Sequence, residues 1–249
     1  MGTNIKPYNK DKSSKKEQIA KMFDSIAERY DFLNHFLSLG IDILWRKRAI
    51  REISKVNPKY ILDIATGTGD LAIEACRLNP KKVVGIDISN NMLDFGRVKI
   101  KKKGLDNIIQ MTYGDSEDLQ LKDNSFDAVT AGFGVRNFEN LAKGLSEMNR
   151  VMKKDGIVAI IEPAEPVVFP FKQLYNLYFK SILPFIGKYF SKDEFLSTKG
   201  KGLILTKGVY FILAFVSAIR LPYILNSLAL IFELYLTFGI RLCNAGLET

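Results

Sequence analysis

The stretch Leu62-Asp63-Ile64-Ala65-Thr66-Gly67-Thr68-Gly69-Asp70 decides the fold of this chain. An apolar run over residues 60–62 leads into an acidic residue and then into Gly-x-Gly, which opens a segment with helical character. This order predicts a strand, a glycine loop and a helix N-terminus built around a small cofactor. With Ala72 the spacing also satisfies the dinucleotide fingerprint, so the glycines alone do not separate a nicotinamide cofactor from S-adenosylmethionine.

The acidic residues around the glycine loop favour S-adenosylmethionine. Asp63 and Asp70 would put carboxylates beside a pyrophosphate, whose negative charge they repel. S-adenosylmethionine instead carries a sulfonium and an ammonium group, whose positive charge carboxylates offset. We therefore predict that Asp63, Gly67 and Gly69 surround the amino acid part of this cofactor, with the glycine backbone close to it.

Two further strands are expected to end in acidic residues. Residues 83–87 form an apolar run closed by Asp87, twenty residues after Gly67, at the position where a ribose diol is bound. The run 108–113 leads to Asp115, whose carboxylate is expected to accept a hydrogen bond from an adenine amino group. Each acid alone is equally well explained as a loop residue at a strand end. Three of them in register with a glycine loop indicate a binding site.

From residue 17 onward, apolar periodicity predicts alternating helices and strands. Helices are expected over 17–30, 32–37, 41–54, 69–78, 90–103 and 139–152, and strands over 60–65, 82–87, 108–113, 126–132 and 157–162. This alternation implies a doubly wound α/β fold with a mostly parallel sheet and helices on both faces. We expect a flexible basic arm and one domain, divided into 1–16 (arm), 17–58 (N-terminal helical cap), 59–165 (cofactor-binding core) and 166–249 (helical substrate-side insertion and tail).

The composition is that of a globular enzyme. With 249 residues, 47% of them hydrophobic, the chain can bury a substantial core. Its formal net charge of +9 is compatible with nucleic acid, with anionic lipid headgroups or with solubility alone. No signal peptide and no metal-ligand spacing is evident, and Cys76 lies far from Cys243. These features predict a cytoplasmic protein without a metal site.

Several segments resemble the UbiE/MenG family of quinone C-methyltransferases. They are Phe23-Asp24-Ser25-Ile26-Ala27-Glu28-Arg29-Tyr30-Asp31, Asn34, Ser38-Leu39-Gly40, Trp45-Arg46, Gly132-Phe133-Gly134-Val135-Arg136-Asn137 and residues 147–153. The resemblance covers residues 17–192 and implies a class I methyltransferase fold, S-adenosylmethionine as cofactor and a polyprenylated quinol that is methylated at a ring carbon. It also implies cofactor contacts at Thr68, Asp87, Asp115 and Ser116.

The residues expected to bind and activate the quinol, which accepts the methyl group, follow from the chemistry of the reaction. A quinol ring carbon becomes nucleophilic when a phenolic proton leaves, and the pKa of that proton is about 10 by analogy with tyrosine. Arg136 follows the fourth strand, and its guanidinium would stabilise the oxyanion. Asn137 is expected to hold the second ring oxygen, and Tyr30 to cap the site and relay the proton, directly or through water. Alternatives are a surface salt bridge for Arg136 and a helix N-cap for Asn137, whereas His35, the only histidine, is better explained by packing than by catalysis.

The segment after Glu162 is rich in aromatic residues from 169 to 189, and it predicts either an apolar wall for a polyprenyl chain or a helix packed on the sheet edge. Glu162 and Glu165 are weaker candidates for orienting the quinol. Residues 196–232 match the family poorly and hold two uncharged runs, each shorter than the ~20 residues of a membrane-spanning helix. They are interpreted as a lid or membrane contact, as a diverged helix and strand, or as a shifted reading frame.

Two other classes of protein are weighed against this interpretation. A nucleic-acid methyltransferase would use the positive charge, but the sequence has no appended RNA-binding module and no Asn-Pro-Pro-Tyr-type motif. A cofactor-binding scaffold without catalysis would keep the glycine loop and lose acceptor-side residues such as Arg136. We therefore expect an enzyme with a polyprenyl quinol substrate and no nucleic acid partner. Peripheral contact with the inner face of a membrane and a homodimer are left open.

Overall fold

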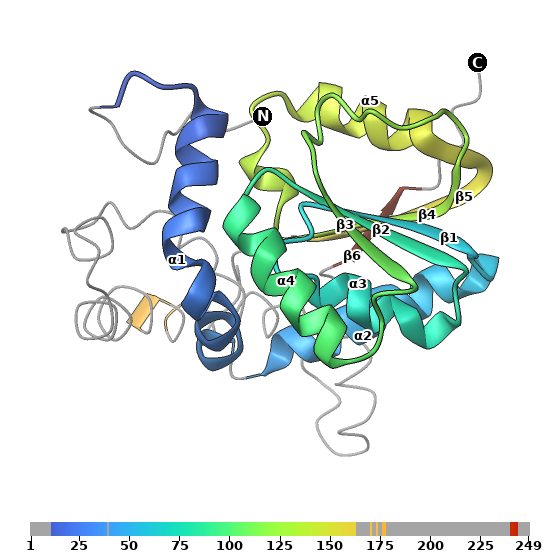
Figure 1. Cartoon of the computed structure of the whole chain (residues 1–249), viewed down its shortest axis with the longest axis horizontal. Coiled ribbons are helices and arrows are strands. Elements are labelled where there is room, and N and C mark those ends of the chain that lie inside the picture. Colours follow the sequence, from blue (N-terminus) through green and yellow to red (C-terminus); the bar gives the residue numbers. More distant parts are fainter. Residues whose placement is uncertain are drawn as a thin grey trace.

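The computed structural model describes residues 11–38, 40–162, 170, 173, 176–177 and 240–243. Within these residues the chain forms one six-stranded sheet in the order β3-β2-β1-β4-β5-β6 (Figure 1). The strands are β1 (Tyr60–Ile64), β2 (Lys82–Asp87), β3 (Ile109–Tyr113), β4 (Phe126–Gly132), β5 (Met152–Ile161) and β6 (Ile240–Cys243). The first five strands pair in parallel and β6 pairs antiparallel with β5. The predicted mostly parallel sheet is confirmed.

Helices cover both faces of this sheet. They are α1 (Lys15–Leu37), α2 (Ile41–Ile53), α3 (Asp70–Ala75), α4 (Asn90–Lys102) and α5 (Leu141–Val151), with 3-10 turns at Ser54–Val56, Cys76–Leu78 and Val135–Asn137. One apolar core joins α2, α3 and α4 to the sheet, and a second joins α5 to the opposite face. Figure 1 shows α5 on one side of the strands and α2, α3 and α4 on the other.

Strand residues divide between the two cores because successive side chains point to opposite faces. In β1, Ile61 faces the core with α2, α3 and α4, whereas Leu62 and Ile64 face the core with α5. Four consecutive residues of β1, Ile61–Ile64, are buried, as expected for a central strand covered on both faces. This arrangement leaves the loops at the carboxyl ends of the strands as the place for a ligand.

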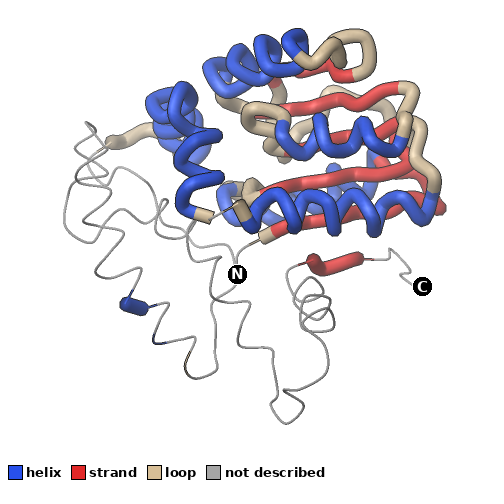
Figure 2. Tube along the Cα trace, turned by 90° about the horizontal axis from the view of Figure 1, so that it is seen from below, coloured by secondary structure: helices blue, strands red, loops and turns tan. Residues whose placement is uncertain are grey.

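Helix α1 stands at one end of the sheet, beyond the strands (Figures 1 and 2). It begins with a capping box, in which the Ser14 hydroxyl accepts from the main chain of Glu17 and the Glu17 carboxylate accepts from the main chain of Ser14. Lys15 and Lys16, which the sequence analysis assigns to a basic arm, therefore belong to the helix. Residues 11–14 of that predicted arm precede the helix, with Ser14 as its N-cap, and residues 1–10 lie outside the described residues.

Most element boundaries lie within two residues of the predictions, and three differ more. Residues 17–37 form one helix without the expected break, since Asp31 continues the helical turn. Helix α3, Asp70–Ala75, is shorter than the predicted helix 69–78, and a 3-10 turn at Cys76–Leu78 follows it. Strand β5 begins at Met152, five residues before the predicted start. Such shifts are ordinary where tertiary packing, and not local propensity, decides where an element starts.

Among the described helices, none combines the length and apolar character needed to cross a membrane. Apart from residues 170, 173, 176 and 177, the aromatic segment at 169–189 lies outside the described residues. The same holds for the tail at 196–235 and for Glu165.

Candidate active site

A pocket lies at the carboxyl ends of β1, β2, β3 and β4, with about 670 Å³ of empty space, part of which is open solvent. Its wall combines loop residues from these strand ends with one face of α1. The α1 residues are Lys16, Ile19, Phe23 and Tyr30, whose spacing of three, four and seven places them on one side of the helix. Of these four residues only Tyr30 is predicted from the sequence, and the helical periodicity is the signal that indicates the other three.

The glycine loop after β1 reaches the pocket through a tight backbone turn. Ala65, Gly67 and Gly69 all have positive φ, at 52°, 55° and 81°. The main-chain N–H of Gly67 donates to Oδ2 of Asp87 over 2.8 Å, which ties the loop to the end of β2. Gly67 and Ala65 line the pocket, whereas Gly69 does not. The loop therefore presents its first half to a ligand.

Asp87 lies where the sequence predicts it, at the end of β2 in the pocket wall. Besides the bond from Gly67, its Oδ1 accepts from the main-chain N–H of Ser89 over 2.9 Å. Burial raises the pKa of this carboxyl above its ordinary value, and the two main-chain bonds oppose the shift. A carboxylate held at this strand end is suited to accept from a ribose diol.

Asp115 and Ser116 also line the pocket, beyond the end of β3. The ammonium of Lys16 forms an ion pair with Asp115 and lies 3.7 Å from the buried carboxylate of Glu117. Burial opposes the charged form of Lys16, yet these carboxylates raise its pKa above the usual value. Helix α1 is thus attached to the predicted adenine end of the pocket.

Asp63 takes a different position from the other strand-end acids. It is 1% exposed, is absent from the pocket wall, and accepts from the hydroxyls of Thr66 over 2.6 Å and Thr130 over 2.7 Å. Burial raises its pKa to about 6, and the two hydroxyl bonds oppose the shift. Its predicted contact with the cofactor stays a prediction, and in this structure it supports the glycine loop from beneath through Thr66.

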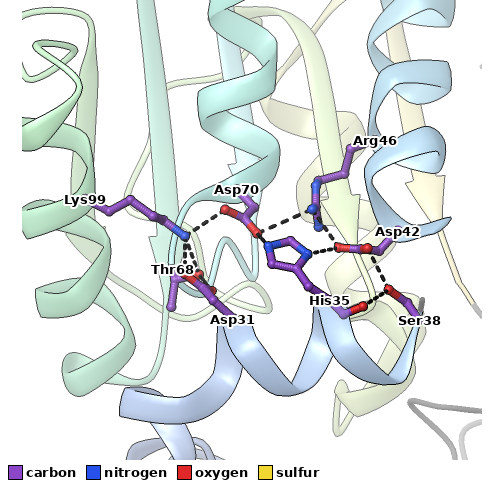
Figure 3. Close-up of polar contacts among 8 residues, drawn as sticks. All are labelled: Asp31, His35, Ser38, Asp42, Arg46, Thr68, Asp70 and Lys99. Atoms are coloured by element: carbon purple, nitrogen blue, oxygen red, sulfur yellow. Dashed lines mark hydrogen bonds and ion pairs between the residues drawn. The ribbon is translucent and has the colours of Figure 1, made fainter. Parts of the chain in front are cut away.

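Thr68 belongs to a polar network behind the loop, drawn in Figure 3, and not to the pocket wall. Its hydroxyl donates to Asp31 of α1 and accepts from Lys99 of α4 over 3.0 Å. Lys99 also pairs with Asp31 over 2.6 Å and with Asp70 over 2.7 Å. Although burial would raise it, these ion pairs and Arg46 hold the pKa of Asp70 below its usual value. Thr68 therefore lies outside the described pocket wall, and its predicted contact with the cofactor stays a prediction.

His35 completes this network. Its Nδ1 lies 2.7 Å from Oδ2 of Asp42, and its Nε2 lies 3.6 Å from Oδ2 of Asp70. Asp42 also pairs with Arg46 over 2.7 Å, so the network joins α1 and α2 to the start of α3 (Figure 3). His35 is absent from the pocket wall, which supports the packing interpretation over a catalytic one.

The side of the pocket predicted to hold the methyl acceptor is formed by Tyr30 and by residues 133–140 after β4. We call residues 133–140 the acceptor loop. Asn137 lies in the wall together with Phe133 and Phe138. A Cβ placed on Gly67 would lie 3.8 Å from Cε1 of Tyr30, so the phenol ring stands directly over the glycine loop. Burial raises the pKa of Tyr30, and therefore its hydroxyl stays protonated near neutral pH. The N-cap of α5 is Asn140, not Asn137, which removes the capping alternative for Asn137.

Arg136 is next to the wall residue Asn137 but does not itself line the pocket. Its Nη1 donates to Oε2 of Glu162 over 2.9 Å, and its main-chain N–H donates to Oε1 of the same residue over 3.1 Å. The salt bridge weighed as an alternative for Arg136 therefore exists. Both side chains are 23% exposed, so the pair is partly sheltered from solvent.

Comparisons with known proteins agree with this geometry. Residues 11–198 match the model of the ubiE/COQ5 methyltransferase family. The chain is 50% identical over 191 residues to a demethylmenaquinone methyltransferase of Bacteroides fragilis, covering 76% of this chain and 78% of that protein. It is 46% identical over 182 residues to the ubiquinone/menaquinone biosynthesis C-methyltransferase UbiE of Citrifermentans bemidjiense, covering 72% and 77%. The solved structure of the [4+2]-cyclase SpnF aligns with a TM-score of 0.51 at 21% identity, covering 59% and 60% of the two chains, which shows likeness of fold alone.

Proposed function

The chain belongs to the ubiE/COQ5 methyltransferase family and is an S-adenosylmethionine-dependent methyltransferase, and we propose that it methylates a ring carbon of a polyprenylated quinol. Its relatives are named for demethylmenaquinone and for ubiquinone/menaquinone biosynthesis. The observation that carries the proposal is the acceptor side of the pocket. There Asn137 shares the wall with the aromatic residues Phe133 and Phe138, and the ring of Tyr30 lies over the glycine loop.

The pocket fits S-adenosylmethionine by the chemistry of its donors and acceptors. Asp87 presents a carboxylate at the ribose position, and Asp115 and Ser116 offer polar groups at the adenine end. The apolar side chains of Ile88 and Met92 lie in the same wall and suit the face of a purine ring. When bound, the cofactor supplies an electrophilic methyl group on a sulfonium. All other roles fall to residues of this chain.

The acceptor-side residues are proposed to position and activate the quinol. The guanidinium of Arg136 favours the phenolate form, which pushes electron density onto the ortho ring carbon. Asn137 holds the second ring oxygen. Tyr30, whose hydroxyl stays protonated, acts as a hydrogen-bond donor, so a water molecule beside it is the better acceptor for the departing proton.

The acceptor must be the reduced ring, because a quinone is electron-poor and its carbon cannot displace a methyl group from sulfur. Labelled S-adenosylmethionine and demethylmenaquinone, incubated with the enzyme with and without a reductant, test this directly. We expect label in the lipid in the presence of reductant only. Equal labelling of the oxidised lipid would refute the phenolate mechanism, and label in added tRNA in place of lipid would overturn the substrate assignment.

Peripheral contact with the inner face of a membrane is part of this proposal, since the substrate is a lipid. The side chains of Phe32 and Phe36 support it: they are 58% and 46% exposed and stack on each other with ring centroids 5.6 Å apart on α1. Co-sedimentation with vesicles that contain anionic lipid tests the contact. Binding that falls in the Phe32→Ser, Phe36→Ser double variant supports this contact, whereas unchanged binding, or no binding by the parent protein, contradicts it.

A further inference from the structure

We infer that Glu162 is a positioning residue for methyl transfer, which fixes Arg136 and sets the effective charge of its guanidinium. The inference rests on the proposed function, from which it takes the role of Arg136. The carboxylate of Glu162 follows β5, the strand that pairs with β4.

Glu162 binds Arg136 at two separate points with its two oxygens. Oε1 accepts from the main-chain N–H of Arg136 over 3.1 Å, and Oε2 accepts from Nη1 over 2.9 Å. One carboxylate therefore restrains both the backbone and the end of the side chain, and the long arginine loses freedom at both ends. Charge-assisted bonds of this kind are stronger than neutral ones and impose direction.

The carboxylate itself is rigidly placed. Glu162 directly follows β5, whose last residue, Ile161, is paired in register with Gly132 of β4. The carbonyl of Ile161 also accepts from the main-chain N–H of Phe133 over 2.7 Å. Strands β4 and β5 thus leave the sheet side by side, and Glu162 lies beside the first residues of the acceptor loop.

The other end of the acceptor loop is held by two further groups. Oε1 of the buried Glu117 accepts from the main-chain N–H groups of Glu139 over 2.6 Å and Asn140 over 3.1 Å. The ammonium of Lys15 donates to the carbonyl of Phe138 over 2.7 Å. Backbone bonds from Asn137 to Gly134 and from Phe138 to Val135 also close the turn around Arg136, so the bond to Glu162 mainly decides the conformation of the Arg136 side chain.

The pairing leaves the guanidinium able to act. A guanidinium has five N–H donors. Within the described residues, the side-chain bond of Arg136 to Glu162 uses only a donor on Nη1. The carboxylate also offsets part of the positive charge. Loss of the negative charge at residue 162 should therefore have two effects: a less well oriented guanidinium lowers turnover, and a less compensated one stabilises the phenolate at lower pH.

A matched control exists in the same molecule. Glu147 accepts from Arg150 over 2.7 Å and from the main-chain N–H of Leu119 over 2.8 Å, so it combines an arginine and a backbone donor as Glu162 does. Neither Glu147 nor Arg150 lines the pocket, and, unlike Arg136, neither is next to a wall residue in the sequence. A change at this pair reports what the loss of such a clamp does to stability alone.

The experiment compares the full chain with its Glu162→Gln, Glu162→Asp and Glu147→Gln variants, using labelled S-adenosylmethionine and chemically reduced demethylmenaquinone. For Glu162→Gln we expect cofactor affinity within about twofold of the parent and turnover lower by about tenfold or more, as for a misplaced catalytic group. The acid limb of its pH–turnover profile should move to lower pH. Glu162→Asp should recover part of the turnover, and Glu147→Gln should lower the melting temperature without moving the profile.

Parent-like turnover and an unmoved acid limb in Glu162→Gln would overturn the inference, as would the same shift in Glu147→Gln. If neither Glu162 variant folds while Glu147→Gln does, the carboxylate is structural and the inference fails. Inactivity of the parent on the quinol would instead reject the proposed function, so the two failures are distinguishable.

Discussion

The glycine loop after β1 and the acceptor loop after β4 face the same pocket but are held in place differently. Each begins with a non-glycine residue at positive φ, Ala65 at 52° and Phe133 at 61°. The glycine loop combines a turn in its own backbone, where the N–H of Gly69 donates to the carbonyl of Thr66 over 2.9 Å, with the bond from Gly67 to Asp87 at the end of β2. The acceptor loop also has bonds within its backbone, and two carboxylates distant in sequence hold it, Glu162 at Arg136 and Glu117 at Glu139.

The difference is that Asp87, which holds the glycine loop, lies in the pocket wall, whereas Glu162, which holds Arg136, lies outside that wall. Residues in unfavourable backbone conformations persist where the surroundings over-determine them, and both loops meet that condition by different means. Variants that act on one loop should therefore affect cofactor binding and turnover separately. A variant at the contact between the loops should affect both.

The largest effect is expected for Arg136→Ala, which acts on the acceptor loop alone. Loss of one electrostatic donor to a developing oxyanion typically lowers turnover by about 10²-fold or more. Cofactor affinity should be unchanged, because Arg136 follows β4, whereas the residues assigned to the ribose and adenine, Asp87 and Asp115, follow β2 and β3. Steady-state kinetics and calorimetry on the same preparation check both statements. Normal methylation by the folded variant would remove Arg136 from the mechanism.

The next effect concerns Asp63, which joins the strands from which the two loops leave. Its pKa in the folded protein is raised to about 6 from 3.8, so the folded state binds its proton more tightly than the unfolded state does. This contribution to stability is complete below the unfolded pKa, is lost as pH rises through the folded one, and amounts to about 2 to 3 kcal/mol. The free energy of unfolding of the parent, relative to Asp63→Asn, should fall by this amount between about pH 4 and pH 7. Denaturant titrations of both proteins without cofactor measure this fall in the free energy of unfolding. If the difference between the two proteins does not change with pH, the pKa of Asp63 is not raised in the folded state.

Asp87→Ala tests the glycine-loop side. The variant loses a charged partner for the cofactor and also the acceptor of the Gly67 N–H group. We expect weaker binding of S-adenosylmethionine by about 1 to 3 kcal/mol. Calorimetry provides the measurement, with turnover at saturating cofactor as the control. Unchanged affinity, or tighter binding of a nicotinamide dinucleotide, would contradict the assignment.

The smallest effect is expected where the loops touch. A Cβ on Gly134 would lie 2.3 Å from Cβ of Ala65, so Gly134→Ala forces the two loops apart. The free energy of unfolding should fall by about 1 to 2 kcal/mol, because loops can shift to relieve part of the overlap. Cofactor affinity and turnover should fall together.

The control for that contact is a second substitution. Ala65→Gly removes the atom that the new methyl group meets and also suits the positive φ at residue 65. The Gly134→Ala, Ala65→Gly double variant should recover most of the lost stability in thermal unfolding. A double variant no more stable than Gly134→Ala alone would show that the contact does not set the loop spacing.

Much of the fold followed from local pattern. Apolar runs that end near acidic residues predicted β1, β2 and β3, because strands buried on both faces are nearly continuously apolar. The alternation of strands and helices predicted the parallel sheet. Boundaries were less predictable at α1 and β5. There, contacts such as Asp31 with Lys99, far apart in sequence, extend or stabilise the element.

The sequence by itself determined the glycine loop, Asp87 at its strand end and the family signature around Arg136, since each depends on residues close together along the chain. Only the tertiary structure separated Asp63, buried beneath the loop, from Asp87 in the pocket wall. Only it paired Arg136 with Glu162 and assigned Thr68 to the network behind the pocket. The physical reason is that burial and partner choice depend on which strand ends and helices meet in space, and a linear pattern records neither.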